Sequence, residues 1–200
     1  MSLLPQTMTD HKTTLPDHIL FNDNHVDFWV FAYGSLMWNP GFEYTERQPA
    51  TLNGYSRALC IYSWVHRGTP ETPGLVFGLD KGRNCDGFAF NIPKHARKDT
   101  VAMLRGRELV TDVYQETLEP LKLTGATPRT VKALFYIAVQ DHAQYAGNLD
   151  HADQIRLIKQ GVGKSGINRD YILNTQSHLV KEGIHDEDLS LLCEQINAES

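Results

Sequence analysis

The sequence predicts one α+β domain built around a curved or barrel-like sheet. Segments typical of strands are concentrated in the first part of the 200-residue chain, and helical patterns dominate the last part. Because strands and helices do not alternate regularly, this order fits a doubly wound α/β sheet less well. The length is that of one domain, usually roughly 100–200 residues, and is sufficient to bury a core without metal or disulfide support.

The first strand is expected from Phe28 to Tyr33. This segment is rich in aromatic and β-branched side chains, the composition of a buried strand, and Gly34 ends it in a turn. Residues 1–26 are polar, are interrupted by proline and show little hydrophobic periodicity. We therefore expect residues 1–26 to form a loosely held tail and residues 27–200 to form the domain.

The remaining elements are separated by glycine, proline and asparagine. Further strands are expected at residues 51–63, 74–79, 85–91, 113–118 and 130–139. One helix is expected from Pro93 to Leu109. After the last strand, helices are expected over residues 152–160, 169–182, closed by Gly183, and 186–197.

Composition excludes several classes of function. The net charge of -5 is spread along the chain without a basic block, which argues against a nucleic-acid partner. No apolar run approaches the roughly 20 residues that span a bilayer, and the polar N-terminus lacks a signal core, so we expect a cytoplasmic protein. The cysteines Cys60, Cys85 and Cys193 are scattered and form no CxxC pair, and no HExxH is present. We expect reduced thiols, no metal site and no cofactor.

Glu108 occupies an unusual position in the helix expected before it. Val101, Leu104 and Glu108 follow the i, i+3, i+7 spacing of one helical face, so a carboxylate points toward the core. Burial would raise its pKa and suit it to accept and return a proton near neutral pH. The alternatives are that Arg105 or Arg107 pairs with Glu108, or that the buried face lies elsewhere on the helix.

The turn from Tyr33 to Leu36 is a second candidate. Gly34 permits a positive φ and a close backbone approach, so successive N–H groups here could converge on an anion or a developing oxyanion. Ser35 adds a hydroxyl donor. The alternative is an ordinary strand-ending turn, and the absence of a G-x-S-x-G elbow argues against a serine hydrolase.

Two further segments contain residues of chemical interest. Residues 161–166 are similar to a phosphate-binding loop, but Ile158 stands where the required earlier glycine belongs, so we reject nucleotide binding. His66 and Arg67 lie in a loop rich in glycine and proline. They could line a pocket, and the alternative is an exposed loop histidine.

Four spaced segments resemble the ChaC-like family of glutathione-specific γ-glutamylcyclotransferases. The first is Trp-Val-Phe-Ala-Tyr-Gly-Ser-Leu-Met-Trp-Asn-Pro at residues 29–40. The similarity is specific because the segments occur together and in order, and it spans about residues 28–195. The others are residues 54–57 with 66–69 and 73–74, residues 107–111 before Tyr114, and residues 165–173.

The resemblance implies a fold, a reaction and a site. The fold would be a small mixed β-barrel flanked by helices, and the reaction would be cleavage of glutathione into 5-oxoproline and cysteinylglycine without metal or cofactor. Ala32 stands where many members have glycine, the smallest possible departure. The resemblance places the catalytic acid/base at Glu108 and substrate binding at Val30, Phe31, Ala32, Tyr33, Gly34, Ser35, Leu36 and Tyr171.

Two alternatives to glutathione cleavage remain open. One is a cyclotransferase for other γ-glutamyl amines or amino acids, and the other is a non-catalytic protein that binds γ-glutamyl compounds. Within the glutathione reading, charge alone suggests that Arg57 and Arg67 recognise the glycyl carboxylate.

Overall fold

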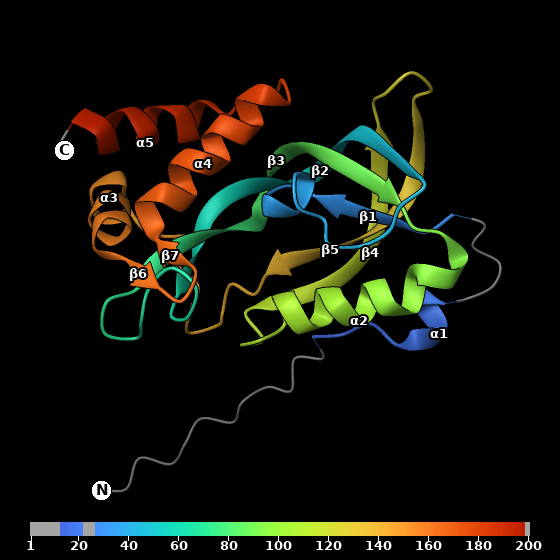
Figure 1. Cartoon of the computed structure of the whole chain (residues 1–200), viewed down its shortest axis with the longest axis horizontal. Coiled ribbons are helices and arrows are strands. Elements are labelled where there is room, and N and C mark those ends of the chain that lie inside the picture. The colour runs from blue at the N-terminus through green and yellow to red at the C-terminus, as the bar shows by residue number, and fades with distance from the viewer. Residues whose placement is uncertain (1–12, 22–26, 199–200) are drawn as a thin grey trace, which may run out of the picture.

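Five strands close into a mixed barrel (Figure 1), in the order β1-β3-β2-β4-β5. The structure is a computed structural model that describes residues 13–21 and 27–198. Strand β1 (Trp29–Ala32) closes the barrel, since it pairs antiparallel with β3 (Gly74–Asn91) and parallel with β5 (Arg129–Ala138). The predicted α+β class with a small mixed barrel is confirmed. The other two strands are β2 (Glu46–Ser63) and β4 (Tyr114–Leu123).

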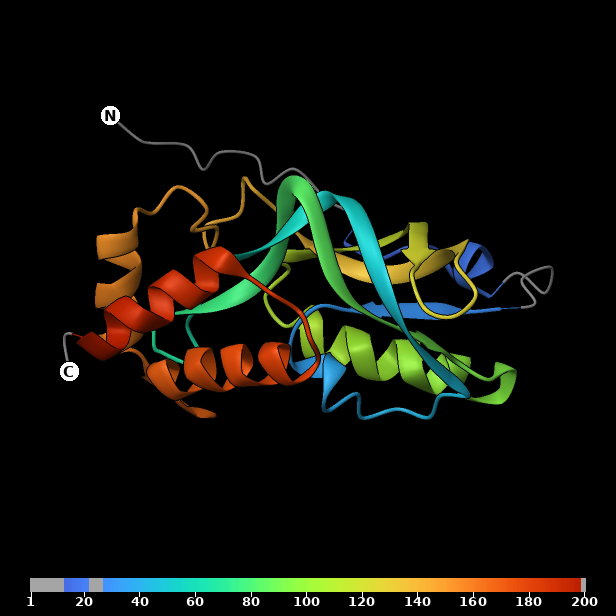
Figure 2. The same cartoon turned by 90° about the horizontal axis from the view of Figure 1, so that it is seen from above.

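Strands β2 and β3 form one long curved ribbon (Figure 2). Register shifts between Asn53 and Tyr55 and between Ala58 and Ile61 interrupt the ladder, and such bulges bend a strand pair. The expectation of separate strands at 74–79 and 85–91 is wrong. The polar residues between them continue the pairing with β2 on the exposed side of the ribbon, so no turn is needed there.

The four residues of β1 are all buried, and they belong alternately to two clusters. Trp29 and Phe31 pack in a cluster made of strand residues alone, which we identify as the barrel interior. Val30 and Ala32 face the other way, into a cluster that joins the strands to the helices. Burial on both faces explains why this strand has a continuous apolar sequence.

Helix α2 (Arg97–Glu108) follows a 3-10 turn, η2 (Lys94–Ala96), and packs along the barrel. The four-residue helix α1 (Asp17–Leu20) lies beside it (Figure 1). The Leu15 N–H donates to Glu116 Oε2 at 2.9 Å, and Leu20 is buried. Residues 13–21 are therefore packed against the domain, in contrast to the expected loose tail. Residues 1–12 and 22–26 of that predicted tail lie outside the described residues.

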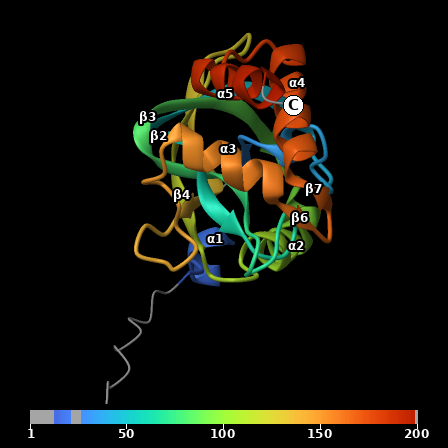
Figure 3. The same ribbon diagram turned by 90° about the vertical axis from the view of Figure 1, so that its left-hand side faces the viewer.

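The C-terminal helices cover one end of the barrel (Figure 3). They are α3 (His151–Gln160), α4 (Asn168–Lys181) and α5 (Glu187–Ala198), and each begins and ends within one residue of its predicted bounds. A two-stranded hairpin of β6 (Val162–Gly163) and β7 (Gly166–Ile167) joins α3 to α4. Across the described residues, no helix has the length and apolar character to cross a bilayer.

Candidate active site

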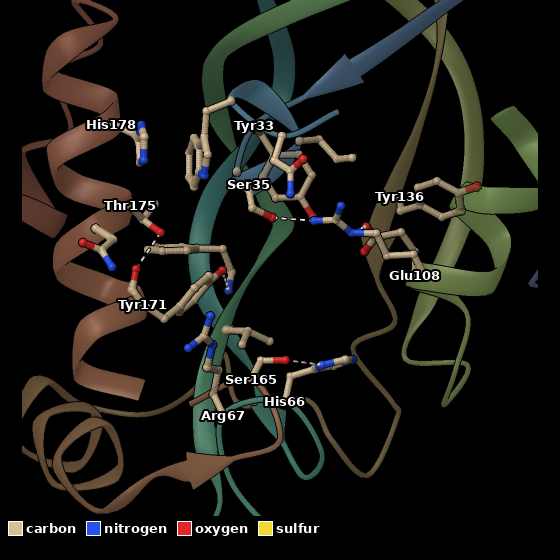
Figure 4. A pocket seen from close by; sticks show the side chains of 18 of the residues that line it. Tyr33, Ser35, His66, Arg67, Glu108, Tyr136, Ser165, Tyr171, Thr175 and His178 are labelled. Carbon is tan, nitrogen blue, oxygen red and sulfur yellow. Dashed lines mark hydrogen bonds and ion pairs between the residues drawn. The ribbon is translucent and has the colours of Figure 1, made fainter. Parts of the chain in front are cut away.

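A cavity of about 830 Å³ lies where the end of β1, helix α2, strand β3 and helix α4 meet (Figure 4). This volume is within the usual range for small-molecule sites, about 300–1,000 Å³. Aromatic, hydroxyl and charged side chains are mixed in its wall. The lining residues are Phe31, Tyr33, Gly34, Ser35, Leu36, Trp38, Asn39, His66, Arg67, Val76, Phe77, Arg107, Glu108, Tyr114, Tyr136, Ser165, Tyr171, Asn174, Thr175 and His178.

Glu108 is the last residue of α2, and its side chain is 19% exposed. Val101 and Leu104 on the same face are buried, as the helical spacing predicts. Burial raises the pKa of the Glu108 carboxyl, and the Arg107 guanidinium opposes that shift, with Arg107 Nε 3.2 Å from Glu108 Oε1. The position at the negative end of the helix dipole also disfavours the carboxylate form. The carboxylate is thus partly buried on the predicted face of the helix, and the alternative pairing with Arg107 is present as well.

Four tyrosines from separate elements surround this carboxylate: Tyr33, Tyr114, Tyr136 and Tyr171. Burial raises the pKa of each phenol, and the negative charge of Glu108 raises it further. All four therefore remain protonated near neutral pH. Sequence reasoning assigned no role to Tyr114 or Tyr136. Tyr114 follows residues 107–111, one of the segments that resemble the ChaC-like family, and this proximity could have indicated it.

The turn after β1 begins the 3-10 helix η1 (Ser35–Met37). Gly34 has φ -138° and ψ -137°, so it does not use the positive φ that glycine permits. A Cβ on Gly34 would meet no atom within 4 Å, so the open cavity adjoins the backbone at this position. Arg107 Nη2 donates to Ser35 Oγ at 2.6 Å, and Arg107 thereby links the turn to Glu108.

The predicted substrate-binding run is divided between the cavity and the core. Phe31 and the residues from Tyr33 to Leu36 line the cavity, as does Tyr171. Val30 and Ala32 are 1% and 0% exposed and lie in the core instead. The reason is the alternation of side chains along β1, which turns these two residues toward the helices.

Arg57 and Arg67 occupy different environments. The Arg57 side chain is 4% exposed, and its guanidinium donates to the Tyr33 carbonyl at 2.6 Å, the Asp86 carbonyl at 2.6 Å and Asp186 Oδ2 at 3.0 Å. These contacts make Arg57 a structural link behind the turn, so the suggestion that it recognises a substrate carboxylate is not supported. Arg67 does line the cavity.

The loop with His66 and Arg67 is held against the β6–β7 hairpin by backbone hydrogen bonds. Lys164 N–H donates to the Val65 carbonyl at 2.9 Å, and Ser165 N–H donates to the His66 carbonyl at 2.9 Å. His66 Nδ1 and Ser165 Oγ are 3.0 Å apart. The hairpin thus supports this loop, and it contributes Ser165 to the cavity wall.

Neither metal nor thiol chemistry is indicated by the described residues. Residues 13–21 and 27–198 contain no cluster of three histidine, cysteine, aspartate or glutamate side chains suited to a metal ion. The three cysteines are free and buried, and burial raises the thiol pKa to about 12 for Cys60 and to about 11 for Cys85 and Cys193. Such thiols are protonated and unreactive at neutral pH.

The barrel and its helical layer first define a class of fold, that of the γ-glutamylcyclotransferases. The crystal structure of a γ-glutamylcyclotransferase specific to glutathione from yeast superimposes with a TM-score of 0.78 at 22% identity, covering 87% of this chain and 97% of that one. This similarity concerns the fold.

The sequence then identifies the family: the chain belongs to the ChaC-like proteins, whose family model matches residues 28–199. The glutathione-specific γ-glutamylcyclotransferase of Escherichia coli is 34% identical over 162 residues, 81% of this chain and 69% of that protein. γ-Glutamylcyclotransferase 2-3 of Arabidopsis thaliana is 34% identical over 175 residues, 84% of this chain and 87% of that protein.

Proposed function

We propose that this protein cleaves glutathione into 5-oxoproline and cysteinylglycine, with Glu108 as general acid and base. The main observation that supports this proposal is a partly buried carboxylate with a raised pKa, Glu108, in the wall of a cavity that the turn at Gly34 also lines. Family membership supports the same reaction, since relatives over most of the chain are named for it.

The reaction needs geometry and proton transfer, because both reactants belong to one molecule. The substrate α-amine attacks its own γ-carbonyl and closes a five-membered ring, and the bond from that carbonyl to the cysteinyl nitrogen then breaks. Enforced proximity of this kind can supply about 7–11 kcal/mol of the barrier. A cavity that holds the folded conformer therefore contributes a large part of the rate.

Glu108 balances the protons of this reaction. Its carboxylate takes one proton from the substrate ammonium, which frees the nitrogen lone pair for attack. The protonated carboxyl then returns that proton to the departing cysteinyl nitrogen as the C–N bond breaks. The ring nitrogen releases a second proton, which leaves 5-oxoproline with one N–H and converts the freed amine of cysteinylglycine to its ammonium form, so no water or cofactor is consumed. A raised pKa assists both steps, because the acid and base forms must both be accessible near the working pH.

The turn and the tyrosines would stabilise the charges of the substrate. The first N–H groups of η1 have no acceptor inside that helix, and they begin at Ser35 beside the cavity. They can donate to the α-carboxylate or to the oxyanion formed on the γ-carbonyl. The phenols of Tyr114 and Tyr136 already donate to the Phe77 carbonyl and to Glu116 Oε1, so Tyr33 and Tyr171 are the tyrosines that would offer further donors to the substrate.

The substrate and setting proposed here suit a cytoplasmic enzyme without a nucleic-acid partner. Free, buried cysteines fit a reducing compartment, and that compartment is where a thiol peptide such as glutathione is kept reduced. The net charge of -5 offers nothing to a phosphate backbone.

The decisive variant is Glu108→Gln, which preserves shape but cannot transfer a proton. We expect the release of 5-oxoproline from glutathione to fall by about 100- to 10,000-fold while glutathione binding persists. Glu194→Gln, an exposed position on α5, serves as the matched control and should retain full activity. A Glu108→Gln protein that works near the wild-type rate would rule out this mechanism.

Substrate panels separate the alternatives. Purified protein is incubated with glutathione, oxidised glutathione or a γ-glutamyl dipeptide, and 5-oxoproline is measured in each. Activity on the dipeptide without activity on glutathione would support a cyclotransferase for other γ-glutamyl amines. Recovery of intact, bound glutathione would support a non-catalytic binding protein.

A further inference from the structure

We propose that Arg67 binds the C-terminal carboxylate of the substrate, so that the protein selects γ-glutamyl peptides that end in a free carboxylate two residues beyond the scissile bond. This inference rests on the proposed function and adds a determinant of substrate choice to it. The residue concerned lies in the loop that follows β2 and lines the cavity.

Arg67 differs from the other arginines near the site in lacking an acidic partner. Arg107 is paired with Glu108, and Arg57 is paired with Asp186. Within residues 13–21 and 27–198, no carboxylate pairs with Arg67, whose Nη1 donates to the Ile167 carbonyl at 3.3 Å. A guanidinium is always charged and has five N–H donors, so most of its capacity remains for an anion in the cavity.

The guanidinium is also held in place before any substrate arrives. Arg67 N–H donates to Ser63 Oγ at 2.9 Å, which fixes the backbone. The guanidinium carbon lies 5.0 Å from the centre of the Tyr171 ring, a cation–π contact, and the Ile167 carbonyl holds one of its nitrogens. Because the side chain is already ordered, binding an anion costs less conformational entropy than it would for a free arginine.

Arg67 and Glu108 lie on different sides of the cavity. Figure 4 shows Arg67 near Ser165 and His66, with Glu108 across the open space beside the turn at Ser35. The pKa of Tyr171 is influenced by charges on both sides of the cavity. Burial raises its pKa to about 12, and among the smaller influences the charge of Glu108 raises the pKa and the charge of Arg67 lowers it.

The substrate has a second carboxylate at the end remote from its reacting atoms. When the γ-glutamyl group is placed at Glu108, the cysteinylglycine portion extends away from the scissile carbonyl by about 7 Å, at roughly 3.5 Å per residue. Its terminal carboxylate is the anion that can reach the opposite wall. The α-carboxylate cannot leave Glu108, because it shares a carbon with the reacting amine.

Substrate and enzyme are altered together to test this assignment. The substrates are glutathione and its C-terminal amide, γ-glutamyl-cysteinyl-glycinamide, which differ in the carboxylate alone. We expect Arg67→Gln to lower kcat/KM for glutathione by about 10- to 100-fold, mainly through KM, as for loss of a charge-assisted contact. The wild type should disfavour the amide by a similar factor, and Arg67→Gln should process the amide about as well as the wild type does.

Lys164→Gln is the matched control, since it removes an exposed positive charge from the β6–β7 hairpin that holds the Arg67 loop, outside the cavity wall. It should preserve the preference for the acid. Arg67→Lys keeps the charge and should retain part of that preference, which protects the test if Arg67→Gln folds poorly.

An equal loss on both substrates in Arg67→Gln would overturn the assignment, because a residue that only supports the loop cannot distinguish acid from amide. Equal use of acid and amide by the wild type would overturn it as well. A wild-type protein that releases no 5-oxoproline from either substrate would instead remove the proposed function, and this outcome is recognised without any variant.

Discussion

Asn168 is expected to contribute strongly to stability, although it touches neither Glu108 nor the turn at Gly34. It is the first residue of α4 and is 0% exposed. Its Oδ1 accepts from the Leu75 N–H at 2.7 Å, and its Nδ2 donates to the Leu75 carbonyl at 2.7 Å. The side-chain amide therefore pairs with β3 as a neighbouring strand would, and it fixes the start of α4 to the barrel.

Replacing Asn168 by alanine leaves the Leu75 N–H and carbonyl without these partners inside the protein. Each unsatisfied buried group costs about 1–3 kcal/mol, so Asn168→Ala should lower the free energy of unfolding by about 2–6 kcal/mol. For a chain of this size, each kcal/mol corresponds to roughly 2–4 °C in the melting temperature. Urea denaturation at neutral pH, followed by tryptophan fluorescence, measures the loss directly.

The control for this variant is Asn148→Ala. Asn148 is exposed in the loop before α3, and its replacement should change stability by no more than about 0.5 kcal/mol. If Asn168→Ala also lost less than about 1 kcal/mol, the pairing with Leu75 would not hold α4 to the barrel, and the reasoning would fail.

Three further predictions concern groups at or behind the cavity. Since the pKa of Glu108 is raised by burial, its favourable contribution is complete below the pKa of an unfolded glutamate and is lost as pH rises through the folded pKa. The melting temperature of Glu108→Gln should therefore rise relative to that of the wild type as pH increases from about 4.5 to 8. A difference in melting temperature that stays constant over this range would contradict the raised pKa. Gly34→Ala places a methyl group in open space, so stability should change by less than about 1 kcal/mol, whereas KM for glutathione should rise; an unchanged KM would show that substrate does not approach this backbone. Arg57→Met should lower the free energy of unfolding by about 3 kcal/mol in urea denaturation, because the Asp186 carboxylate and two carbonyls lose a buried donor. Arg57→Lys should recover part of this loss, and equal stability of the Met and Lys variants would argue against a structural role for the Arg57 charge.

The elements that could be predicted are those whose local pattern matches their burial. β1 is apolar throughout because both of its faces are covered, and α2 shows its buried face as Val101 and Leu104. Glu108 could be singled out because helical geometry is local: its position relative to Leu104 follows from the chain alone. Local geometry does not reveal the groups that other elements bring near it.

The tyrosines around Glu108 depend on contacts between distant segments. Tyr136 reaches the site because β5 pairs with β4 in a register that places it opposite Glu116, and its hydroxyl donates to Glu116 Oε1 at 3.0 Å. That register is set by the closure of the barrel and by the turn between the strands, and neither can be predicted from the residues near Tyr136 alone. Pairing with another strand, in this case β2, likewise joined the two predicted halves of β3.

The glycines of the segment before α4 allow two stretches of backbone to pack closely together. A Cβ on Gly163 would lie 2.6 Å from the Gly68 nitrogen and 2.6 Å from the His66 carbonyl oxygen, so a larger residue would push the hairpin away from the loop. A Cβ on Gly161 would lie 2.5 Å from the Arg67 carbonyl oxygen. These distances are too short for any side chain, and glycine is required because two backbones meet there.

The N–H groups of this segment are also occupied. In a phosphate-binding loop they would point at the anion, whereas here Lys164 and Ser165 donate to the carbonyls of Val65 and His66. The sequence of this segment resembles a phosphate-binding motif, but its N–H groups bind the backbone of the loop at residues 65–66. Because the clamped loop bears His66 and Arg67, the glycines fix the position of the one cavity-lining arginine in the described chain that has no acidic partner. The substrate selection proposed for Arg67 thus depends on glycines that never contact the substrate, and enlarging Gly163 should weaken the preference for a free carboxylate more than the proton transfer at Glu108.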